Sequence, residues 1–323
     1  MFDAIAMGMS CFDFGIVMEK MPGFNENGKV VSVSWQGGGK TATGIVATAR
    51  LFDGNYAFYG ACGGQLGEFN ANDFTRHGID VSHMIRKEGQ NSVLDVCIAD
   101  RSNGGRSFCP CAPFTTSPVL DMDDIDPEFL KQTRYLFVAD ARPATLEAIR
   151  IVHENGGKVI VDADSYNEDI LKNLKSYDII IPSEFFYRTH FKGHEEDYEG
   201  NLKAFKALAN PGATVIFTLG ENGLIGLDEN NEFFRLPAFK VDVMDTTGAG
   251  DVFHGAFLAA VLRGMDIKTA ARFSSAVSAI KCTRVGGRAG IPTYDVVSRF
   301  LEAGEIDYTE IDQRVAMYAQ MPL

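Results

Sequence analysis

The stretch Asp245-Thr246-Thr247-Gly248-Ala249-Gly250-Asp251 leads directly into an apolar run that extends from Val252 to Leu262. Glycine adopts backbone conformations that are closed to other residues, and it lets a ligand approach the main chain closely. The run that follows has the length and composition of a helix. The sequence therefore predicts a glycine-containing loop that opens a helix.

The start of this helix has the features of a phosphate site. Its first N–H groups have no partner within the helix and lie at the positive end of the helix dipole, so they favour an anion. The carboxylate of Asp251 would repel a bound phosphoryl group unless it takes a proton from an attacking hydroxyl. This combination is typical of kinase chemistry. The alternative is an ordinary Asp/Thr/Gly turn in which Asp251 caps a core helix.

The segment resembles the signature of the PfkB/ribokinase family of carbohydrate kinases. The resemblance implies that Asp251 is the catalytic base and that the backbone of Gly248, Ala249 and Gly250 forms the anion hole. It also implies an α/β fold of the ribokinase-like type, a three-layer α/β/α sandwich with a mostly parallel central sheet and a small β-sheet lid. The similarity extends from Asp3 to about Leu301, and we expect residues 1–323 to form one catalytic domain.

Composition limits the classes of partner. The chain has 323 residues, of which 46% are hydrophobic, so it can bury a large core. Thirty basic and 43 acidic residues leave a formal charge of −13, which would repel nucleic acid and anionic lipid. The sequence has no apolar run of about 18 residues and no charged n-region of a secretory signal. We expect a cytoplasmic protein that binds neither nucleic acid nor membrane.

The six cysteines are scattered and show no paired CxxC spacing, which favours reduced thiols over disulfides or a zinc site. Cys109 and Cys111 form the one cluster, on either side of Pro110. They are either a redox or metal pair or two small side chains on one face of a strand, and we favour the second interpretation.

Strand-like and helix-like segments alternate along most of the chain, which predicts a parallel sheet covered by helices on both faces. Two pairs of β-leaning segments interrupt this alternation, at residues 14–20 with 29–35 and at 92–99 with 106–111. In the family such insertions form a lid over the sugar, and the lid often makes the dimer contact. We therefore expect a lid from about 14–35 and 92–112 and a homodimer formed through it.

The resemblance assigns several residues to the sugar. Asp13 follows the first predicted strand, where open α/β sheets bind ligands, although an aspartate there can also simply form a turn. Gly38 and Gly39 match the N-terminal Gly-Gly signature of the family. Thr43 stands where ribokinases use an asparagine for ribose, and residues 63–65 replace the family's Gly-Asp-Asp, so we do not expect a plain ribokinase.

The same glycines invite a P-loop interpretation. Gly39-Lys40-Thr41 ends like a Walker A motif, and Asp162 ends an apolar strand like a Walker B aspartate. The leading glycine of that motif should stand at position 34, which is Ser34. We favour the sugar-site interpretation because it shares a fold with the C-terminal motif. A P-loop NTPase and a non-catalytic sugar or nucleotide sensor are the alternatives of another class.

The resemblance places ATP and the metals in the C-terminal half. The candidate ATP-binding residues are Thr218, Gly220, Gly223 and Ser275. A monovalent cation, expected to be K⁺, would lie beside the anion hole, and its candidate ligands are Asp245, Thr247, Lys281, Arg284, Gly286 and Gly290. Arg284 has the alternative interpretation of a surface charge. The family's Asn-x-x-Glu magnesium motif is replaced by residues 183–186, so Glu184 is the candidate Mg²⁺ ligand while Phe186 cannot hold a metal-bound water.

Long runs of the sequence, at 237–243 and 281–292 and including His254, are similar to the sulfofructose kinase branch of the family. In that branch cationic side chains hold the sulfonate, and the matching residues here are Lys29 and Arg142. Lys29 is alternatively a solvated hairpin lysine. We expect an ATP-dependent kinase that phosphorylates a primary hydroxyl of a ketose, with 6-deoxy-6-sulfofructose as a candidate. A neutral sugar, a sugar acid or a nucleoside is the alternative substrate.

Overall fold

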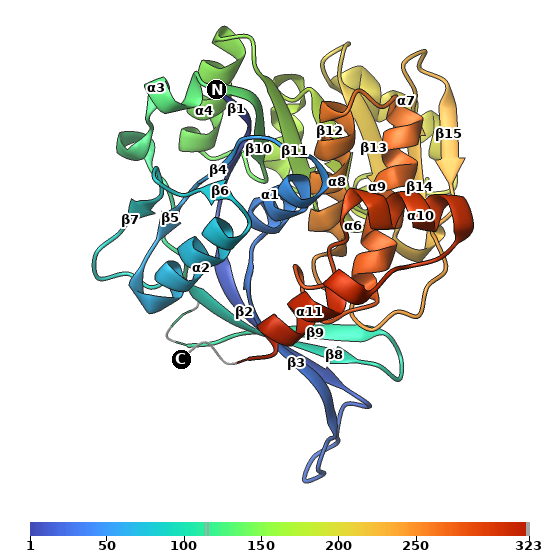
Figure 1. The fold of residues 1–323 in the computed structure, drawn as a ribbon. Helices are drawn as coiled ribbons and strands as arrows, with labels where there is room; N and C mark the ends of the chain where they lie inside the picture. The colour runs from blue at the N-terminus through green and yellow to red at the C-terminus, as the bar shows by residue number, and fades with distance from the viewer. Residues whose placement is uncertain (113, 115, 321–323) are drawn as a thin grey trace.

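The computed structural model describes residues 1–112, 114 and 116–320. Its centre is a nine-stranded sheet with the strand order β15-β14-β13-β12-β11-β10-β1-β4-β6 (Figure 1). The strands from β13 to β6 in this order pair in parallel, and β14 and β15 add an antiparallel edge. The nine strands are β1 (Phe2–Met7), β4 (Tyr56–Tyr59), β6 (Ile79–Asp80), β10 (Thr133–Val138), β11 (Lys158–Ala163), β12 (Ile179–Pro182), β13 (Thr214–Thr218), β14 (Leu224–Leu227) and β15 (Phe233–Leu236).

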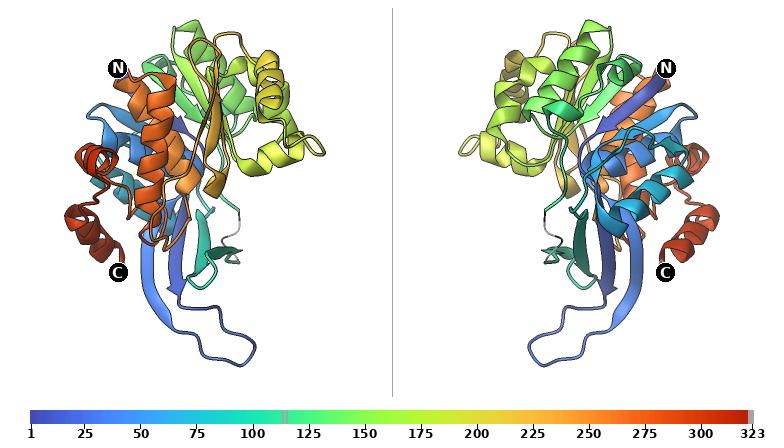
Figure 2. Two further views of the ribbon diagram at one scale, coloured as in Figure 1. Left: turned by 90° about the vertical axis from the view of Figure 1, so that its right-hand side faces the viewer. Right: turned by 90° about the vertical axis from the view of Figure 1, so that its left-hand side faces the viewer.

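Helices cover both faces of this sheet, which Figure 2 shows from its edges. One face carries α1 (Lys40–Leu51), α2 (Gly64–Arg76), α8 (Ala249–Leu262), α9 (Ile267–Cys282), α10 (Tyr294–Ala303) and α11 (Thr309–Tyr318). The other face carries α3 (Pro127–Leu130), α4 (Pro143–Glu154), α5 (Glu168–Lys172), α6 (Glu184–His190) and α7 (Tyr198–Leu208).

The core follows from the strand sequences. Strands that are covered on both faces read as continuous apolar runs, and their successive side chains point to opposite faces. In β11, Ile160 packs into the core beneath α1 and α8, whereas Val159 and Val161 pack into the core beneath α4 and α7. The expected three-layer sandwich with a mostly parallel sheet is therefore confirmed.

A separate four-stranded sheet, in the order β3-β2-β8-β9, forms the small lid at the lower end of Figure 1. Its strands are β2 (Cys11–Met18), β3 (Val30–Gly38), β8 (Val93–Asp100) and β9 (Gly105–Pro110). The loop between β2 and β3 projects away from the body. The lid strands begin earlier than expected, so Asp13 lies inside β2 and not in a turn after β1, because Cys11 to Met18 pair along their whole length with β8.

Two parts of the fold lie outside the segments that the sequence analysis assigned. The segment after β12 forms the helices α6 and α7, and the segment after residue 301 contributes α11 to the packed structure. A two-residue pair, β5 (Ala61–Cys62) with β7 (Ile85–Arg86), lies beside α2. In the described part of the chain, no helix has the length and apolar character needed to cross a membrane.

Candidate active site

The first turn of α8 is built as an anion site. Gly248 is the N-cap and has a φ of 71°, a left-handed conformation that favours glycine. A Cβ added at position 248 would lie 2.8 Å from the Cα of Gly287, in the loop after α9. This close approach of the two loops is a second reason for glycine at position 248. Within the described residues the amides of Gly250 and Asp251 have no hydrogen-bond partner, and an added Cβ at Gly250 would meet no atom within 4 Å. The first turn of α8 therefore has unpaired amides, and no side chain or neighbouring backbone fills the space beside Gly250.

Asp251 lies in that same turn and is partly buried. Burial raises its pKa well above the ordinary value, and the carboxylate of Asp162 raises it further, while Lys40 opposes the shift. A carboxylate with a raised pKa is a stronger proton acceptor once it is ionised, which is what a general base for a hydroxyl group needs. The burial and the neighbouring charges of Asp251 are therefore compatible with its predicted role as general base.

Asp13 faces the same region from the lid strand β2. It is buried, accepts a hydrogen bond from the thiol of Cys11 at 3.1 Å, and lies beside Asp95 on the neighbouring strand β8. Burial, with a contribution from Asp95, raises the pKa of Asp13 to about 6. Gly38 allows this approach, because a Cβ at position 38 would lie 2.1 Å from the Asp13 carboxylate. Two neighbouring carboxylates of this kind can accept hydrogen bonds from the hydroxyls of a polyol.

The P-loop alternative is not supported by the backbone. Strand β3 continues to Gly38, and α1 begins at Lys40, so residues 34–38 are strand and leave no loop that could cradle phosphates. Only Gly39 separates β3 from α1, and its φ is 98°. A Cβ added at Gly39 would lie 2.4 Å from the carbonyl oxygen of Met9, so the space beside Gly39 is already occupied. The ammonium of Lys40 lies 3.2 Å from the Asp164 carboxylate, not in a phosphate cradle.

A family model, pfkB family carbohydrate kinase, matches residues 1–294. This chain belongs to the pfkB carbohydrate kinase family. A 5-dehydro-2-deoxygluconokinase from Clostridium perfringens is 26% identical over 309 residues, which cover 86% of this chain and 87% of the relative. A ketohexokinase from Mus musculus is 23% identical over 290 residues, with 86% and 95% covered. The predicted enzyme class, a phosphotransferase that acts on a sugar hydroxyl, is confirmed.

Solved structures agree on the fold. A ribokinase from Thermotoga maritima superimposes with a TM-score of 0.74 at 26% identity, over 94% of this chain and all of the ribokinase. A protein assigned as ribokinase II from E. coli, in complex with ATP and Mg²⁺, superimposes with a TM-score of 0.77 at 21% identity, over 94% and 99%. The ribokinase-like fold class is therefore confirmed.

The candidate nucleotide residues lie on adjoining elements of this pfkB kinase. Thr218 ends β13, and the 3-10 turn Gly220–Asn222 follows it, with Gly220 and Gly223 both at positive φ. A Cβ at Gly220 would lie 3.2 Å from the Glu184 carboxylate, so the candidate Mg²⁺ ligand lies beside the nucleotide turn. Ser275 lies on α9, which packs against α8. A backbone turn and a nearby carboxylate are compatible with a nucleotide and its metal ion.

Phe186 belongs to the core and so cannot take part in a metal site. It is fully buried and packs against Tyr166, His190 and Phe205. This packing explains how the chain departs from the family's magnesium motif at this position.

The two cations assigned to a sulfonate each already pair with a carboxylate. Lys29 lies in the projecting loop and pairs with Glu19 at 2.5 Å. Arg142 is the N-cap of α4 and forms two hydrogen bonds to Asp140, at 2.7 and 3.0 Å. Thr43, by contrast, is buried on α1 and faces Gly287, next to the anion hole. The roles of all three residues stay predictions.

The sequence analysis used His254 of α8 only as a point of resemblance and gave it no role. His254 is buried, and its two ring nitrogens lie 2.7 Å from the carbonyl oxygen of Gly250 and 2.8 Å from that of Ile181. Carbonyl oxygens only accept hydrogen bonds, so each ring nitrogen that carries hydrogen can donate to one of them. Asp162 lies 3.5 Å away, and neither of its carboxylate oxygens has a hydrogen-bond partner within the described residues. The spacing of His254 to the motif, four residues after Gly250, was the available signal.

Arg288 was a second omission. Its guanidinium is fully buried, pairs with Asp73 at 2.6 Å and donates to the carbonyl oxygen of Gly38. Tyr318 of α11 donates to the other oxygen of Asp73 at 2.7 Å. The C-terminal helix therefore supports the glycines that lie against Asp13.

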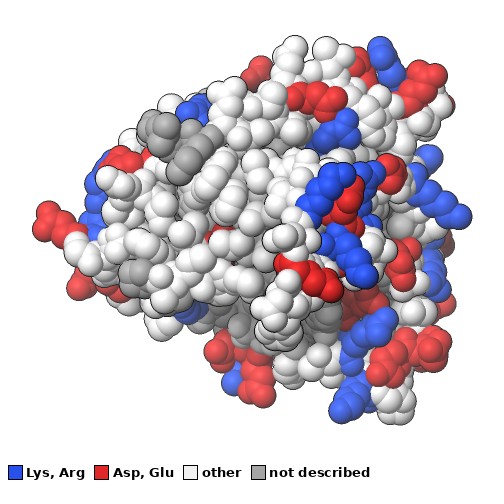
Figure 3. All heavy atoms as spheres, turned by 90° about the horizontal axis from the view of Figure 1, so that it is seen from below, with Lys and Arg blue, Asp and Glu red and all other residues white. Residues whose placement is uncertain are grey.

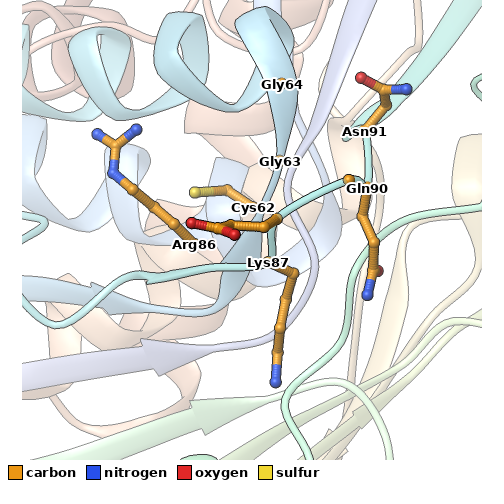
Figure 4. Close-up of a pocket in the computed structure, with 9 residues that line it drawn as sticks. Cys62, Gly63, Gly64, Arg86, Lys87, Gln90 and Asn91 are labelled. Atoms are coloured by element: carbon orange, nitrogen blue, oxygen red, sulfur yellow. The ribbon is translucent and has the colours of Figure 1, made fainter.

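A cavity of about 500 Å³ lies at the start of α2 (Figure 4). Gly63, Gly64 and the segment 86–91 line it, and none of the predicted site residues does. Its two cations are neutralised, Arg86 by Glu68 and Lys87 by Asp121 and Asp124. Cys109 and Cys111 lie elsewhere, as free cysteines at the end of β9, and the favoured interpretation of this pair stays a prediction.

Proposed function

We propose that this pfkB kinase transfers the γ-phosphoryl group of ATP to a primary hydroxyl of a ketose, with Mg²⁺ as cofactor. The observation that carries the proposal is the first turn of α8, where unpaired amides and a carboxylate of raised pKa lie side by side. The amides would stabilise the charge of the transferring phosphoryl group, and Asp251 would accept the hydroxyl proton. Asp13 and the backbone at Gly38 and Gly39 would orient the sugar.

ATP and Mg²⁺ would bind beside the nucleotide turn. Thr218, Gly220, Gly223 and Ser275 would contact ATP, and Glu184 would hold Mg²⁺ through its position next to Gly220. A ribokinase-fold structure in complex with ATP and Mg²⁺ supports these two cofactors. Mg²⁺ would neutralise charge on the phosphates.

The sugar is proposed at two levels. The ketohexokinase and 5-dehydro-2-deoxygluconokinase relatives support a ketose or a keto sugar acid. Within that class, 6-deoxy-6-sulfofructose is our candidate, because Arg142 offers a planar cation at the end of β10. An anionic substrate would have to compete with Asp140 for Arg142, which already makes two hydrogen bonds there.

A screen of ketoses, ketose sulfonates, ketose phosphates, sugar acids and nucleosides, with ADP formation as the readout, tests the proposal. Arg142→Ala should lower kcat/KM for sulfofructose more than for fructose, by about 1–2 kcal/mol, since the side chain is partly exposed. Lys29→Ala should act in the same direction and more weakly. An unchanged ratio for Arg142→Ala contradicts the sulfonate assignment and leaves the ketose assignment to the screen.

We further propose that the lid forms a homodimer. Its outer residues include large exposed apolar side chains, namely Met21, Phe24, Val30, Val31 and Phe108. Figure 3 views the lid end, where uncharged surface covers much of the face and charged side chains gather toward one side. Light scattering after gel filtration tests this, and Val31→Asp combined with Phe108→Asp should give a monomer. A monomeric wild-type protein at micromolar concentration contradicts the proposal.

A further inference from the structure

The loop that leads into the anion hole already binds a cation that belongs to the chain. The ammonium of Lys281 donates hydrogen bonds to the carbonyl oxygens of Asp245, at 3.1 Å, and of Thr247. Lys281 lies in the last turn of α9, and its side chain is fully buried. A lysine ammonium has three donors and no acceptor, so carbonyl oxygens are its natural partners. These two residues are among those expected to hold K⁺.

The charge of this ammonium is balanced locally. The carboxylate of Asp245 accepts the amide of Thr247 at 2.8 Å and the amide of Gly286 at 2.7 Å. Burial alone would raise the pKa of Asp245, but the Lys281 ammonium and these two amides hold it below its ordinary value. An ionised carboxylate and an ammonium thus link the end of α9 to the loops on both sides of the anion hole.

A potassium ion does not fit beside this lysine. Two charges of the same sign repel each other strongly in a buried site, where water does not screen them. The carbonyls of Asp245 and Thr247 are satisfied by Lys281, so they need no ion.

We propose that the Lys281 ammonium takes the place of the monovalent cation, so that this kinase orders its anion-hole loop without K⁺. Residues 245–247 run directly into Gly248, whose left-handed conformation sets the direction of the α8 amides. Fixing two carbonyls of that loop fixes these amides. The inference rests on the proposed anion hole and does not depend on which sugar the enzyme uses.

The first test is the cation response of the wild-type enzyme. Activity is measured in chloride salts of K⁺, Na⁺ and tetramethylammonium at equal ionic strength, with the sugar that gives the highest rate in the screen. ADP is quantified by chromatography, so that no coupling enzyme responds to the cation. We expect rates that agree within about twofold. A rise of fivefold or more with K⁺ would overturn the proposal.

Substitution of Lys281 provides the second test. Lys281→Met keeps the volume and removes the charge, so activity should fall more than tenfold and no salt should restore it. Lys281→Ala leaves a cavity in which K⁺, NH₄⁺ or methylammonium can reach the two carbonyls, so millimolar concentrations should restore activity. Lys206→Met is the matched control, because Lys206 also donates to backbone carbonyls, those of Pro211 and Ala213, at the end of α7. Full activity of Lys281→Met would overturn the proposal.

A stability measurement separates this proposal from the choice of substrate. The Tm of nucleotide-free Lys281→Ala should rise when K⁺ replaces tetramethylammonium, while the Tm of the wild-type protein should not change. This readout needs no turnover, so it holds even if every sugar in the screen fails. A K⁺-dependent Tm in the wild-type protein would show an ion site that Lys281 does not fill, and the proposal would then be wrong.

Discussion

Helices α1 and α8 begin in nearly the same way and differ in what surrounds their first turns. Each has a glycine at the N-cap with positive φ, Gly39 at 98° and Gly248 at 71°, and neither has a side-chain cap. The two helices pack closely, since a Cβ at Gly255 would lie 1.9 Å from the carbonyl oxygen of Gly44. From the sequence alone, the N-terminus of either helix could bind a phosphate.

The surroundings decide between them. At α1, the space beside Gly38 and Gly39 is filled by the Asp13 carboxylate and the Met9 carbonyl, groups that repel an anion and accept hydrogen bonds from hydroxyls. At α8, no atom lies within 4 Å of a Cβ placed on Gly250. A helix N-terminus therefore binds phosphate only where its amides face space free of acceptors, and α1 is suited to the sugar instead.

Among the substitutions that compare the first turns of α1 and α8, we expect the largest loss of activity at Asp251. Asp251→Asn removes the proton acceptor and keeps the side-chain volume, so kcat should fall by about 10²–10⁴-fold. ATP affinity by calorimetry should stay within a few-fold, because the carboxylate acts only on the proton. Turnover within about tenfold of wild type would remove Asp251 from the role of base.

Lys40 tests the other turn. In a P-loop, loss of this lysine would abolish nucleotide binding, but here its ammonium pairs with Asp164 and lowers the pKa of Asp251. Lys40→Met should therefore leave the Kd for ATP within a few-fold. It should lower kcat/KM for the sugar by about tenfold at neutral pH, the scale of one charge-assisted interaction. Loss of ATP binding in a folded variant would contradict the assignment of α1 to the sugar.

Two alanine substitutions in α8 compare its packed face with its open turn. Gly255→Ala forces α8 away from the backbone of α1, so we expect a loss of about 1–3 kcal/mol in the free energy of unfolding. Gly250→Ala meets no atom, so its Tm should be unchanged or slightly higher while kcat falls, because the methyl group enters the space in front of the amides. Urea denaturation and ADP formation measure the two effects. If Gly250→Ala and Gly255→Ala lowered the free energy of unfolding equally, the space beside Gly250 could not be open.

The sequence predicted the layers well because the apolar strands and their spacing carry that information locally. Asp251, Gly248 and the Gly38–Gly39 pair could be assigned because each needs a special backbone or charge at a fixed place in a motif. The helices α6 and α7 were not assigned, although Leu202 and Phe205 of α7 have helical spacing; in α6 the short run with Phe186 carries too little of a period to identify a helix.

Contacts between segments far apart in the chain could not be predicted from the sequence. Arg288 reaches Asp73, which is 215 positions away, and Lys281 reaches Thr247 across the end of α9. Neither pairing follows from local spacing, since each depends on how loops close after the sheet has formed. The expected K⁺ site and the proposed role of Lys281 differ for this reason, because the sequence matches the backbone positions of the site but does not show the direction of the lysine side chain.

The smallest expected effect concerns the charges beneath α8. The charged groups that act on Asp251 are Asp162 on β11, Asp164 after it, Lys40 on α1 and Asp13 on β2. Asp162 also lies beside His254, and Phe137 of β10 stacks on the imidazole. Asp162 raises the pKa of Asp251, so Asp162→Asn should lower that pKa. Because the base works only when ionised, the acid limb of kcat/KM against pH should then move to lower pH.

His254→Gln should move the same limb in the opposite direction. If the imidazole is charged, the substitution removes a cation next to Asp251, so the base stays protonated to higher pH and activity is lost earlier as the pH falls. His153→Gln is the control, because His153 pairs with Asp178 at the amino end of β12, the opposite end of the strand from Ile181. Long-range ¹H–¹⁵N spectra should show hydrogen on both ring nitrogens of His254 in the wild-type protein. The prediction is contradicted if only one ring nitrogen carries hydrogen, or if His254→Gln leaves the acid limb of kcat/KM unchanged. The imidazole would then be neutral, and the backbone amides would be the only source of positive potential at the start of α8.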